Sequence, residues 1–437
     1  MKRIIPIIWL LSVIAIPACK KSNTSGDGTL ATVITLPVSV TATTASSGGN
    51  VSADGGATVT ERGVCWGTVI NPTISGSHSS DGSGTGTFAS AITGLIPNTT
   101  YYVRAYATNS NGTAYGNQVT TTTVVPDVYV AGYKNDFSYP VAAIWKNETL
   151  TMLSSGPSNA NSVFVSGSDV YVAGYEKSSW NVATIWKNGV ATALSTTPGD
   201  ADAASVYVSG ADVYAAGYEN SGGKKVAKSW KNGVPTALTN GSFDAYAKSI
   251  YVAGADIYVA GYETNGTYNV AKIWKNGVVT ALSNGSGDAC ATSVFVSGTD
   301  VYVAGYVRNG PKYIATVWKN AIPTSLTANT SDAYANSVFV SGTDVYVAGY
   351  EDNGFGTAAK LWKNGVASVL PNGANAGYPG YATGVFVTGA DVYVSGFALC
   401  LCGGTNYTAR IWKNAVPGYL SFSSNAKEII ANAVFVK

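Results

Sequence analysis

The sequence predicts an all-β protein made of a small β-sandwich followed by a seven-bladed β-propeller that its C-terminal strand closes. Three observations support this prediction. A phrase close to S-V-F-V-S-G-T-D-V-Y-V-A-G-Y, followed by a segment ending in W-K-N, recurs through the second part of the chain. Short alternating strands, separated by clusters of Gly, Ser and Asn, precede these repeats. The chain ends on a strand that the first repeat lacks.

The composition narrows the classes of function. The chain has 437 residues, of which 46% are hydrophobic and 11% charged, and its formal net charge is +2. A nucleic-acid-binding protein normally carries a basic excess or stripe, so we expect no nucleic acid partner. Fifty glycines and ten tryptophans against one histidine favour tight turns and aromatic packing over acid–base or metal chemistry. We expect neither a cofactor nor a metal site, and we expect a monomer.

Residues 1–19 predict a lipoprotein signal peptide. Met1-Lys2-Arg3 is a short cationic start, and the apolar run from Ile4 to Ile16 has secretory length but is short for a membrane span. The run ends at Ile16-Pro17-Ala18-Cys19, which resembles the bacterial lipobox, and this resemblance implies that Cys19 is acylated. An ordinary signal peptide with an incidental cysteine is the alternative.

The residues after the cysteine predict the location of the protein. Lys20 resembles the residue at this place in Gram-negative lipoproteins of the outer membrane, so we expect an outer-membrane protein held only by its lipid anchor. Acyl chains contribute about 0.8 kcal/mol per buried methylene, so several chains hold a protein firmly. Residues 20–29 are polar and contain glycine, which predicts a flexible tether. Both a periplasmic and an external orientation stay open.

Residues 30–123 predict a single β-sandwich, with strands expected at 38–43, 62–67, 87–92 and 101–107. The segment L-I-P-N-T-T-Y, which ends at Tyr101, resembles the L-x-P-x-T-x-Y motif of fibronectin type III domains. The resemblance implies that the Tyr101 hydroxyl bonds to nearby backbone, and that the domain acts as a spacer. Cys65 has no partner cysteine in this domain, so we interpret it as a small buried hydrophobic residue.

Residues 124–437 predict the propeller. The opening aspartate of D-V/I-Y marks each repeat: Asp127, Asp169, Asp212, Asp256, Asp300, Asp344 and Asp391. Their spacing is 42 to 47 residues, and a period of roughly 40–45 residues with several short strands is typical of propellers. Each repeat predicts four strands, S-V-F-V, V-Y-V-A-G-Y, A-x-I-W-K and V-x-T-x-L. We interpret the recurring tryptophan of the third strand as packing between blades rather than as a ring of ligand-stacking aromatics.

The two ends of the repeat array predict ring closure. Asp127 follows Val125-Pro126 with no S-V-F-V strand immediately before it, whereas the chain ends on such a strand from Asn432 to Lys437. Pairing the two would complete one blade and remove both exposed edges. An open β-solenoid also fits the period, but it leaves the spare strand unexplained.

The repeat resembles the propeller repeats of bacterial extracytoplasmic proteins through its S-G-x-D-x-Y-V-A-G and W-K-N phrases. It lacks the G-H and terminal W-D dipeptides of WD repeats and the Asp-box of sialidase propellers. The resemblance therefore supports the fold and implies no activity.

A four-stranded meander places its connections on two faces of the disc. We call the face with the first–second and third–fourth connections the turn face, and the other the loop face. The turn face carries the seven opening aspartates and seven lysines, from Lys146 to Lys413. We interpret these residues as structural, and we expect the aspartates to bond their own turn backbones.

The loop face carries the candidate ligand-binding residues. Carboxylates precede the first strand or begin the second–third connection, and tyrosines stand near them: Asp200, Asp202, Asp244, Tyr246, Asp288, Asp332, Tyr334, Tyr381, Glu176, Glu219, Glu263 and Glu351. Aromatic rings stack on sugars or peptides, while carboxylates accept their hydroxyl or amide hydrogens. The structural alternative is that the aspartates cap local turns and the tyrosines fill gaps between blades.

A non-catalytic binding or adhesion module for glycan or protein ligands is the leading functional hypothesis. The only histidine, His78, belongs to the first domain, so the repeats have no residue for a histidine-based triad or a multi-histidine metal site. A polysaccharide hydrolase or lyase that uses carboxylates of the loop face is the alternative, and a structural surface protein is a third. Cys400-Leu-Cys402 departs from the repeat and predicts either a strained disulfide or two free thiols, and metal binding is the least favoured alternative because no histidine partner exists in the repeats.

Overall fold

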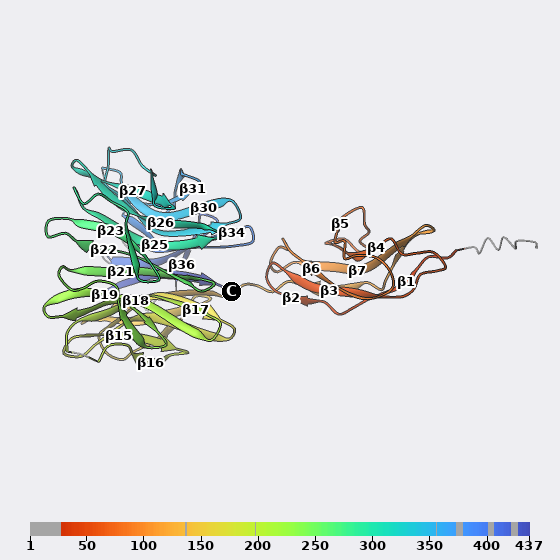
Figure 1. Ribbon diagram of the computed structural model, residues 1–437, viewed down its shortest axis with the longest axis horizontal. Coiled ribbons are helices and arrows are strands. Elements are labelled where there is room, and N and C mark those ends of the chain that lie inside the picture. Colours follow the sequence, from red (N-terminus) through yellow and green to blue (C-terminus); the bar gives the residue numbers. More distant parts are fainter. Residues whose placement is uncertain are drawn as a thin grey trace, which may run out of the picture. The chain divides into compact units, whose positions relative to one another are not determined.

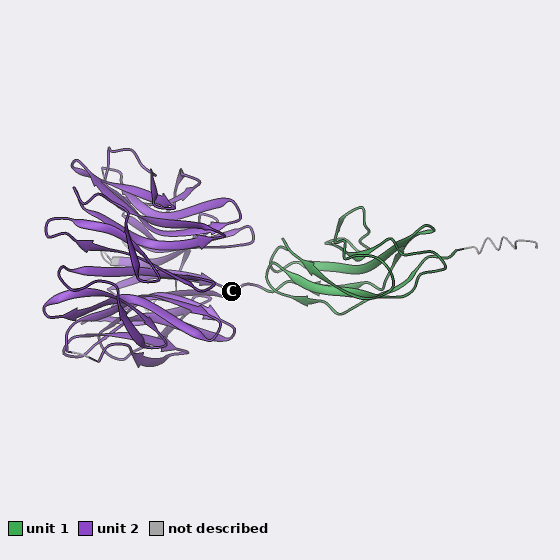
Figure 2. Ribbon diagram, viewed as in Figure 1, with its two compact units in different colours: residues 1–124 green, residues 125–437 purple. Residues whose placement is uncertain are grey.

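The computed structural model describes residues 28–135, 138–196, 198–354, 356–372, 379–400, 406–420 and 427–437, and the described elements are all β-strands. The chain forms two compact units, residues 1–124 and 125–437 (Figure 2). In the described part of the chain, no helix is long and apolar enough to cross a membrane. The predicted leader, Cys19, nearly all of the predicted tether and Cys402 lie outside the described residues, as does the side chain of Cys400.

The first unit consists of two antiparallel sheets. One sheet contains β1 (Thr32–Thr35), β2 (Ser39–Val40), β3 (Ala45–Ala53) and β6 (Gly86–Ile92). The other contains β4 (Glu61–Gly67), β5 (Ser77–His78), β7 (Thr100–Asn109), β8 (Gly112–Tyr115) and β9 (Val119–Thr122). Alternate residues of the main strands meet in one apolar core, which includes Val51, Val64, Ile92 and Val103.

Two details of this unit agree with expectations from the sequence. The Tyr101 hydroxyl accepts a hydrogen bond from the backbone N–H of Ile96 at 3.1 Å, close to it in the chain. Cys65 is a buried free thiol whose Sγ donates to the carbonyl of Pro72 at 3.2 Å. Its burial raises the pKa of the Cys65 thiol to about 11, so the sulfur stays protonated and behaves as part of the core.

The second unit consists of seven four-stranded antiparallel sheets (Figure 1). Sheet 1 contains β10 (Val128–Asn135), β11 (Pro140–Lys146), β12 (Thr149–Met152) and the C-terminal β37 (Glu428–Val436). Sheets 2 to 4 contain β13 (Ser158–Ser166) to β16 (Val190–Ala193), β17 (Ala201–Ser209) to β20 (Val234–Ala237), and β21 (Ala245–Ala253) to β24 (Val278–Ala281). Sheets 5 to 7 contain β25 (Ala289–Ser297) to β28 (Ile322–Ser325), β29 (Ala333–Ser341) to β32 (Val366–Val369), and β33 (Gly380–Thr388) to β36 (Val416–Tyr419).

The middle strands of sheets 2 to 7 complete this arrangement. They are β14 (Asp169–Lys177) and β15 (Asn181–Lys187), β18 (Asp212–Ser221) and β19 (Lys224–Lys231), β22 (Asp256–Thr264) and β23 (Asn269–Lys275), β26 (Asp300–Asn309) and β27 (Lys312–Lys319), β30 (Asp344–Asp352) and β31 (Thr357–Lys363), and β34 (Asp391–Cys400) and β35 (Asn406–Lys413). In each sheet the four strands follow one another as a meander. In sheet 1, β37 pairs with β10 and takes the place of the first strand.

The tryptophan of each third strand is at most 1% exposed and packs between sheets. Trp318 of sheet 5, for example, lies in one cluster with Tyr258 and Leu282 of sheet 4, and its Nε1 donates to the carbonyl of Leu282 at 2.9 Å. Apolar residues on both faces of the first three strands are therefore largely covered by the neighbouring sheets, whereas the fourth strands are exposed. The tryptophans form no ligand-stacking ring.

The C-terminal strand pairs antiparallel with β10, in register from Val128 opposite Val436 to Asn135 opposite Glu428. An aromatic ring on the first strand of each sheet contacts the ring of the next sheet, with centroids 4.7 to 4.9 Å apart, and the last ring contacts the first. The seven rings are Phe164, Tyr207, Tyr251, Phe295, Phe339, Phe386 and Phe435. The arrangement of the sheets is therefore propeller-like.

Candidate ligand-binding face

The turn face repeats one ion pair in all seven sheets, with lysine Nζ 2.7 to 2.8 Å from aspartate Oδ2. In sheet 5, Lys319 pairs with Asp300, and Asn320 Nδ2 donates to the other carboxylate oxygen at 2.8 Å. These hydrogen bonds from Lys319 and Asn320 hold the pKa of Asp300 below its usual value. The Oδ1 of Asn320 accepts from the backbone N–H of Val301.

This geometry corrects one expectation. The opening aspartates do not bond their own turn backbones, because the asparagine of the third–fourth turn makes that backbone contact while the carboxylate binds the lysine and the asparagine amide. The asparagine can do so because it adopts a left-handed conformation, with φ of 51° at Asn320. The same contacts recur in each sheet, so we assign the turn-face residues a structural role.

On the loop face, the aspartates before the first strands anchor the preceding sheet. The Oδ1 atoms of Asp200, Asp244, Asp288 and Asp332 accept hydrogen bonds of 2.8 to 3.0 Å from the backbone N–H groups of Asn181, Lys225, Asn269 and Tyr313. Each bond joins the start of a third strand to the chain entering the next sheet. These four carboxylates therefore have a structural task, but they bond the third strand of the preceding sheet and do not cap local turns as the alternative interpretation of the sequence proposed.

Three of the four predicted glutamates are paired within their own sheets. Glu219 binds Lys228, Glu263 binds Lys272, and Glu351 binds Lys360, the last pair with Nζ and Oε2 3.0 Å apart. The glutamate side chains are 7%, 15% and 21% exposed, respectively. In sheet 2, Glu176 lies at the matching position, but the lysine is replaced by Thr184, whose hydroxyl donates to the carbonyl of Val182.

The three predicted tyrosines are brought together with other aromatic residues. Tyr246, Tyr334 and Tyr381 stack on Tyr262, Tyr350 and Phe397 of the adjacent second strands, with centroids 4.8 to 4.9 Å apart and interplanar angles of 25° to 28°. Each also touches the second-strand ring of the preceding sheet, Tyr218, Tyr306 or Tyr350. We call these eight residues the aromatic arc.

The rings of the aromatic arc are half-buried. Desolvation raises the pKa values of Tyr334 and Tyr350 to about 12, so their hydroxyls stay protonated and can donate to a ligand. Buried Cys290 lies opposite Tyr306 in the paired strands, and desolvation raises the pKa of the Cys290 thiol to about 11. Cys290 is therefore an apolar filler rather than a reactive group.

The first strand of each sheet contains a β-bulge, and most of these bulges carry a polar side chain that joins neighbouring sheets. At five of the seven bulges a side chain donates to the backbone carbonyl of the next first strand, at 2.7 to 3.1 Å: Asn161, Thr292, Asn336, Thr383 and Asn432. Sheets 3 and 4 have Ala204 and Lys248 at this place. The alanine has no polar group, and the exposed lysine has no such hydrogen bond among the described residues.

Lys248 gives this part of the loop face its particular electrostatics. Its Nζ lies 5.4 Å from the ring centre of Tyr246 and 6.0 Å from that of Tyr262. Lys225 Nζ lies 4.9 Å from the same Tyr246 ring and donates to its hydroxyl at 2.7 Å. Tyr246 is therefore flanked by two cations, and a positive group over an aromatic face is attractive.

Asp202, on the first strand of sheet 3, interacts electrostatically with Lys248. Desolvation raises the pKa of Asp202 to about 6, although Lys248 and a 2.7 Å hydrogen bond from Asn161 Nδ2 oppose that rise. The sequence predicted Asp202 and Tyr246 but neither lysine. The available signal was that Lys248 is the only charged residue at the bulge position of the seven repeats.

Three exposed aromatic residues on loop-face connections were also missed. Trp180 is 38% exposed in the connection between β14 and β15, Tyr139 is 41% exposed before β11, and Phe243 is 41% exposed before β21. Trp180 is the one tryptophan of the repeats that lies outside the W-K-N phrase, so its departure from the pattern could have identified it. In the described ranges, no three His, Cys, Asp or Glu side chains gather as metal ligands.

Comparisons with known proteins give remote similarities in structure only. The sequence matches no protein-family model and no curated protein. The structure is similar to TolB from Acinetobacter baumannii, with 11% identity and a TM-score of 0.41 over 61% of this chain and 74% of that chain. It is also similar to a DUF4784 family protein from Bacteroides caccae, with 9% identity and a TM-score of 0.29 over 93% of this chain and 99% of that chain. Similarity at this level carries no assignment of function.

Proposed function

We propose that the protein is a non-catalytic, lipid-anchored binding module of the outer membrane. In this proposal, residues 1–19 are a signal peptide, Cys19 is acylated, residues 20–29 are a tether and residues 30–123 are a fibronectin type III-like spacer. Residues 124–437 form a closed seven-bladed propeller that binds a glycan or protein ligand through its loop face. The pairing of β37 with β10 and the unbroken cycle of seven aromatic rings support closure.

The concentration of aromatic side chains on the loop face carries the binding proposal. The aromatic arc, together with the exposed side chains of Trp180, Phe243 and Tyr139, lies on connections or strand ends of this face. The turn face instead repeats the same ion pair in every sheet. Large rigid aromatic side chains are enriched at recognition surfaces because they bury much apolar area at a low cost in conformational entropy.

The state of the predicted carboxylates favours binding over catalysis. Four aspartates are bound to backbone N–H groups and three glutamates to lysines, so these seven groups are committed to the fold. A polysaccharide hydrolase or lyase needs carboxylates that are available to the substrate. Asp202 and Glu176 are the two predicted carboxylates outside this group of seven, and in our proposal Asp202 contacts the ligand together with Tyr246 and Lys248.

Trp180→Ala tests the binding proposal with little risk to the fold, because the side chain is exposed, whereas the tyrosines of the arc are packed against one another. The mature protein would be applied to an array of neutral and acidic oligosaccharides, and its bound ligand would then be titrated. We expect Trp180→Ala to weaken binding roughly tenfold or more, as for other exposed aromatic anchors. Val190→Ala, at a side chain 69% exposed beside the turn face, is the matched control and should bind normally.

Two outcomes would overturn this proposal. Equal binding by the wild type and the Trp180→Ala/Phe243→Ala double variant would place the ligand on another surface. Release of shortened oligosaccharides from a bound polysaccharide would instead support the hydrolase or lyase alternative.

A further inference from the structure

Arg410, on β35 of sheet 7, is a fully buried charged side chain, with 0% of the residue exposed. Its nitrogens Nε, Nη1 and Nη2 have no hydrogen-bond partner among the residues that the structure describes. A guanidinium has only N–H donors and no acceptor, and a buried charge is costly unless it is paired and hydrogen-bonded. The chemistry of Arg410 therefore calls for a partner with negatively charged acceptor oxygens.

The repeat shows which partner this side chain lacks. In sheets 3, 4 and 6, a third-strand lysine at the same register position binds a second-strand glutamate. In sheet 7 an arginine replaces the lysine, and Ala398 replaces the glutamate. Sheets 2 and 5 have the uncharged Thr184 and Thr316 at the position of Arg410. Sheet 7 therefore keeps the cation of the pair without its carboxylate.

Tyr419 contacts the guanidinium but gives it no acceptor. The two residues lie opposite each other in the register of β35 and β36, and Cζ of Arg410 is 3.9 Å from the centre of the Tyr419 ring. A cation over an aromatic face is attractive, but the ring has no pair of oxygens of the kind that arginine binds bidentately. Tyr419 is 45% exposed, so its ring covers the buried guanidinium on the solvent side.

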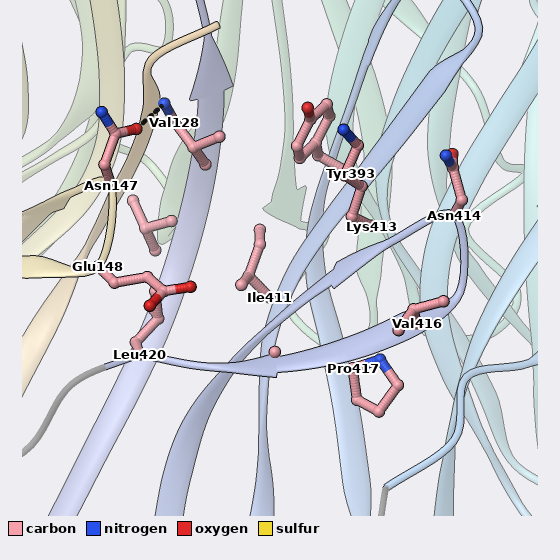
Figure 3. A pocket seen from close by; sticks show the side chains of 12 residues that line it. Val128, Asn147, Glu148, Tyr393, Ile411, Lys413, Asn414, Val416, Pro417 and Leu420 are labelled. Carbon is pink, nitrogen blue, oxygen red and sulfur yellow. Dashed lines mark hydrogen bonds between the residues drawn. The ribbon is translucent and has the colours of Figure 1, made fainter. Parts of the chain in front are cut away.

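The side chain of Arg410 faces sheet 6. Alternate residues of a strand share one side, and Trp412, two residues after Arg410, packs with Leu361 of sheet 6. Figure 3 shows the opposite side of the same strands, where Ile411 and Leu420 line a cavity of about 620 Å³ between sheets 7 and 1. Arg410 thus belongs to the space between sheets 6 and 7 and not to that cavity.

The space between sheets 3 and 4 shows the room that the fold has at this place. There Lys272, the counterpart of Arg410, lines a cavity of about 350 Å³. Ala281 lies opposite Lys272, whereas sheet 7 has the much larger Tyr419 at the matching position. A Tyr419 ring that turns outward would therefore open the matching space between sheets 6 and 7, with Arg410 in its wall.

We propose that Arg410 anchors a binding site for a small oxyanion, a carboxylate or a phosphate, and that Tyr419 covers this site. Two oxygens of the ligand accept from the guanidinium, a geometry that gives strong, charge-assisted hydrogen bonds. The ligand supplies the negative charge that Ala398 removes from the repeat, and Tyr419 turns outward to admit it. The site uses none of the residues that we propose for the loop-face ligand.

Thermal unfolding of the mature protein in sodium acetate, sodium phosphate and, as the reference, sodium chloride at equal ionic strength tests this proposal. A ligand that binds only the folded protein raises its melting temperature, and we expect a saturable rise of roughly 2 °C or more above chloride. Arg410→Thr, which copies Thr184 and Thr316, should abolish the rise. Tyr419→Ala, which copies Ala281, should lower the half-saturating concentration of the anion, because no ring has to be displaced. A rise with acetate alone identifies a carboxylate ligand, and a rise with phosphate alone identifies a phosphate.

Two further variants control for general effects of salt. Ala398→Glu restores the glutamate of sheets 3, 4 and 6, so it should melt higher than the wild type in chloride and lose the response to anions. Arg308→Thr removes an exposed arginine of sheet 5 and should keep the response. The proposal is overturned if neither anion gives the wild type a saturable rise, or if Arg410→Thr or Ala398→Glu responds as the wild type does. A higher half-saturating concentration in Tyr419→Ala would overturn the role of Tyr419 as a cover.

Discussion

Asp202 shows how one position in the repeat can acquire a chemistry of its own. Its carboxyl lies on the first strand of sheet 3, where desolvation raises its pKa from 3.8 to about 6. The folded protein therefore holds this proton more tightly than the unfolded chain does. Ionisation of Asp202 weakens folding, so its destabilising effect is absent below pH 4, grows between pH 4 and 6, and is complete above pH 6.

Asp202→Asn should therefore stabilise the protein at pH 7.5 and have little effect at pH 4. The shift of about two pKa units corresponds to a gain of up to about 3 kcal/mol in the free energy of unfolding. An amide oxygen at this position can still accept the hydrogen bond from Asn161. Chemical unfolding at the two pH values measures the effect, and an equal change at both would contradict it.

Asp300→Asn on the turn face is a control of opposite sign. The hydrogen bonds from Lys319 and Asn320 lower the pKa of Asp300, so its stabilising contribution is present above its unfolded pKa and disappears as pH falls through its folded pKa. This variant should destabilise the protein at pH 7.5 and do so less in acid.

At the scale of strands, the second and third strands of different sheets carry different residue pairs at the same register positions. Sheets 3, 4 and 6 have a half-buried glutamate–lysine pair, whereas sheet 5 has Val307 and Thr316 at the same register positions. Removal of one partner from a buried ion pair leaves an uncompensated charge, whereas replacement of both can be nearly neutral. Sheet 2 has Glu176 with Thr184 and sheet 7 has Ala398 with Arg410, so the ion pairs are one of several compatible ways to fill this site.

Glu219→Val alone should cost about 3 kcal/mol of unfolding free energy, because it leaves Lys228 without its partner. The double variant Glu219→Val/Lys228→Thr, which copies sheet 5, should cost less than half as much. Chemical unfolding of the two variants measures the difference. A double variant that is no more stable than the single one would show that the charge is not the cause.

The strands of the repeats could be predicted from the sequence, because the same alternation occurs seven times. The first unit was harder. The strand expected at residues 38–43 is reduced to Ser39–Val40, while the adjacent β3, with the sequence A-S-S-G-G-N-V-S-A, has no β-branched pattern to reveal it. Gly49 is needed there because a Cβ atom would lie 2.6 Å from the Phe88 ring, a contact that only the folded structure shows.

The candidate site could be predicted in position but not in detail. The repeat spacing placed Tyr246, Tyr334 and Tyr381 at equivalent positions on one face. In the structure each of them stacks on a second-strand ring and belongs to the aromatic arc. The repeat spacing could not show that the Asp244 carboxylate accepts a hydrogen bond from the backbone N–H of Lys225, 19 residues earlier in the chain. The distinguishing residues, such as Lys248, depart from the repeat, and a search for common positions overlooks them.

In the whole molecule, the second unit depends on how the two ends of the repeat array meet. At five junctions between neighbouring sheets, a serine hydroxyl on one first strand accepts a hydrogen bond from a backbone N–H on the first strand of the next sheet. The hydroxyl of Ser162, for example, accepts from the N–H of Val206. Sheets 7 and 1 have Gly384 and Ala433 in its place. There Thr383 donates to the carbonyl of Ala431 at 2.7 Å, and Asn432 donates to that of Ala160 at 2.8 Å. The C-terminal strand is thus bonded to both of its neighbouring sheets.

Hydrogen exchange of the C-terminal peptide tests this arrangement most directly. Residues 429–436 lie on β37, which pairs with β10 at one edge of sheet 1, as β13 pairs with β14 at the edge of sheet 2, so their hydrogen-bonded amides should open only with the whole unit and stay protected as long as those of β13. Mass spectrometry of peptides from both strands would compare their exchange over seconds to hours. Protection of the C-terminal peptide equal to that of β13 is the expected result. Complete exchange of residues 429–436 within seconds, while β13 stays protected, would contradict a ring closed by the last strand.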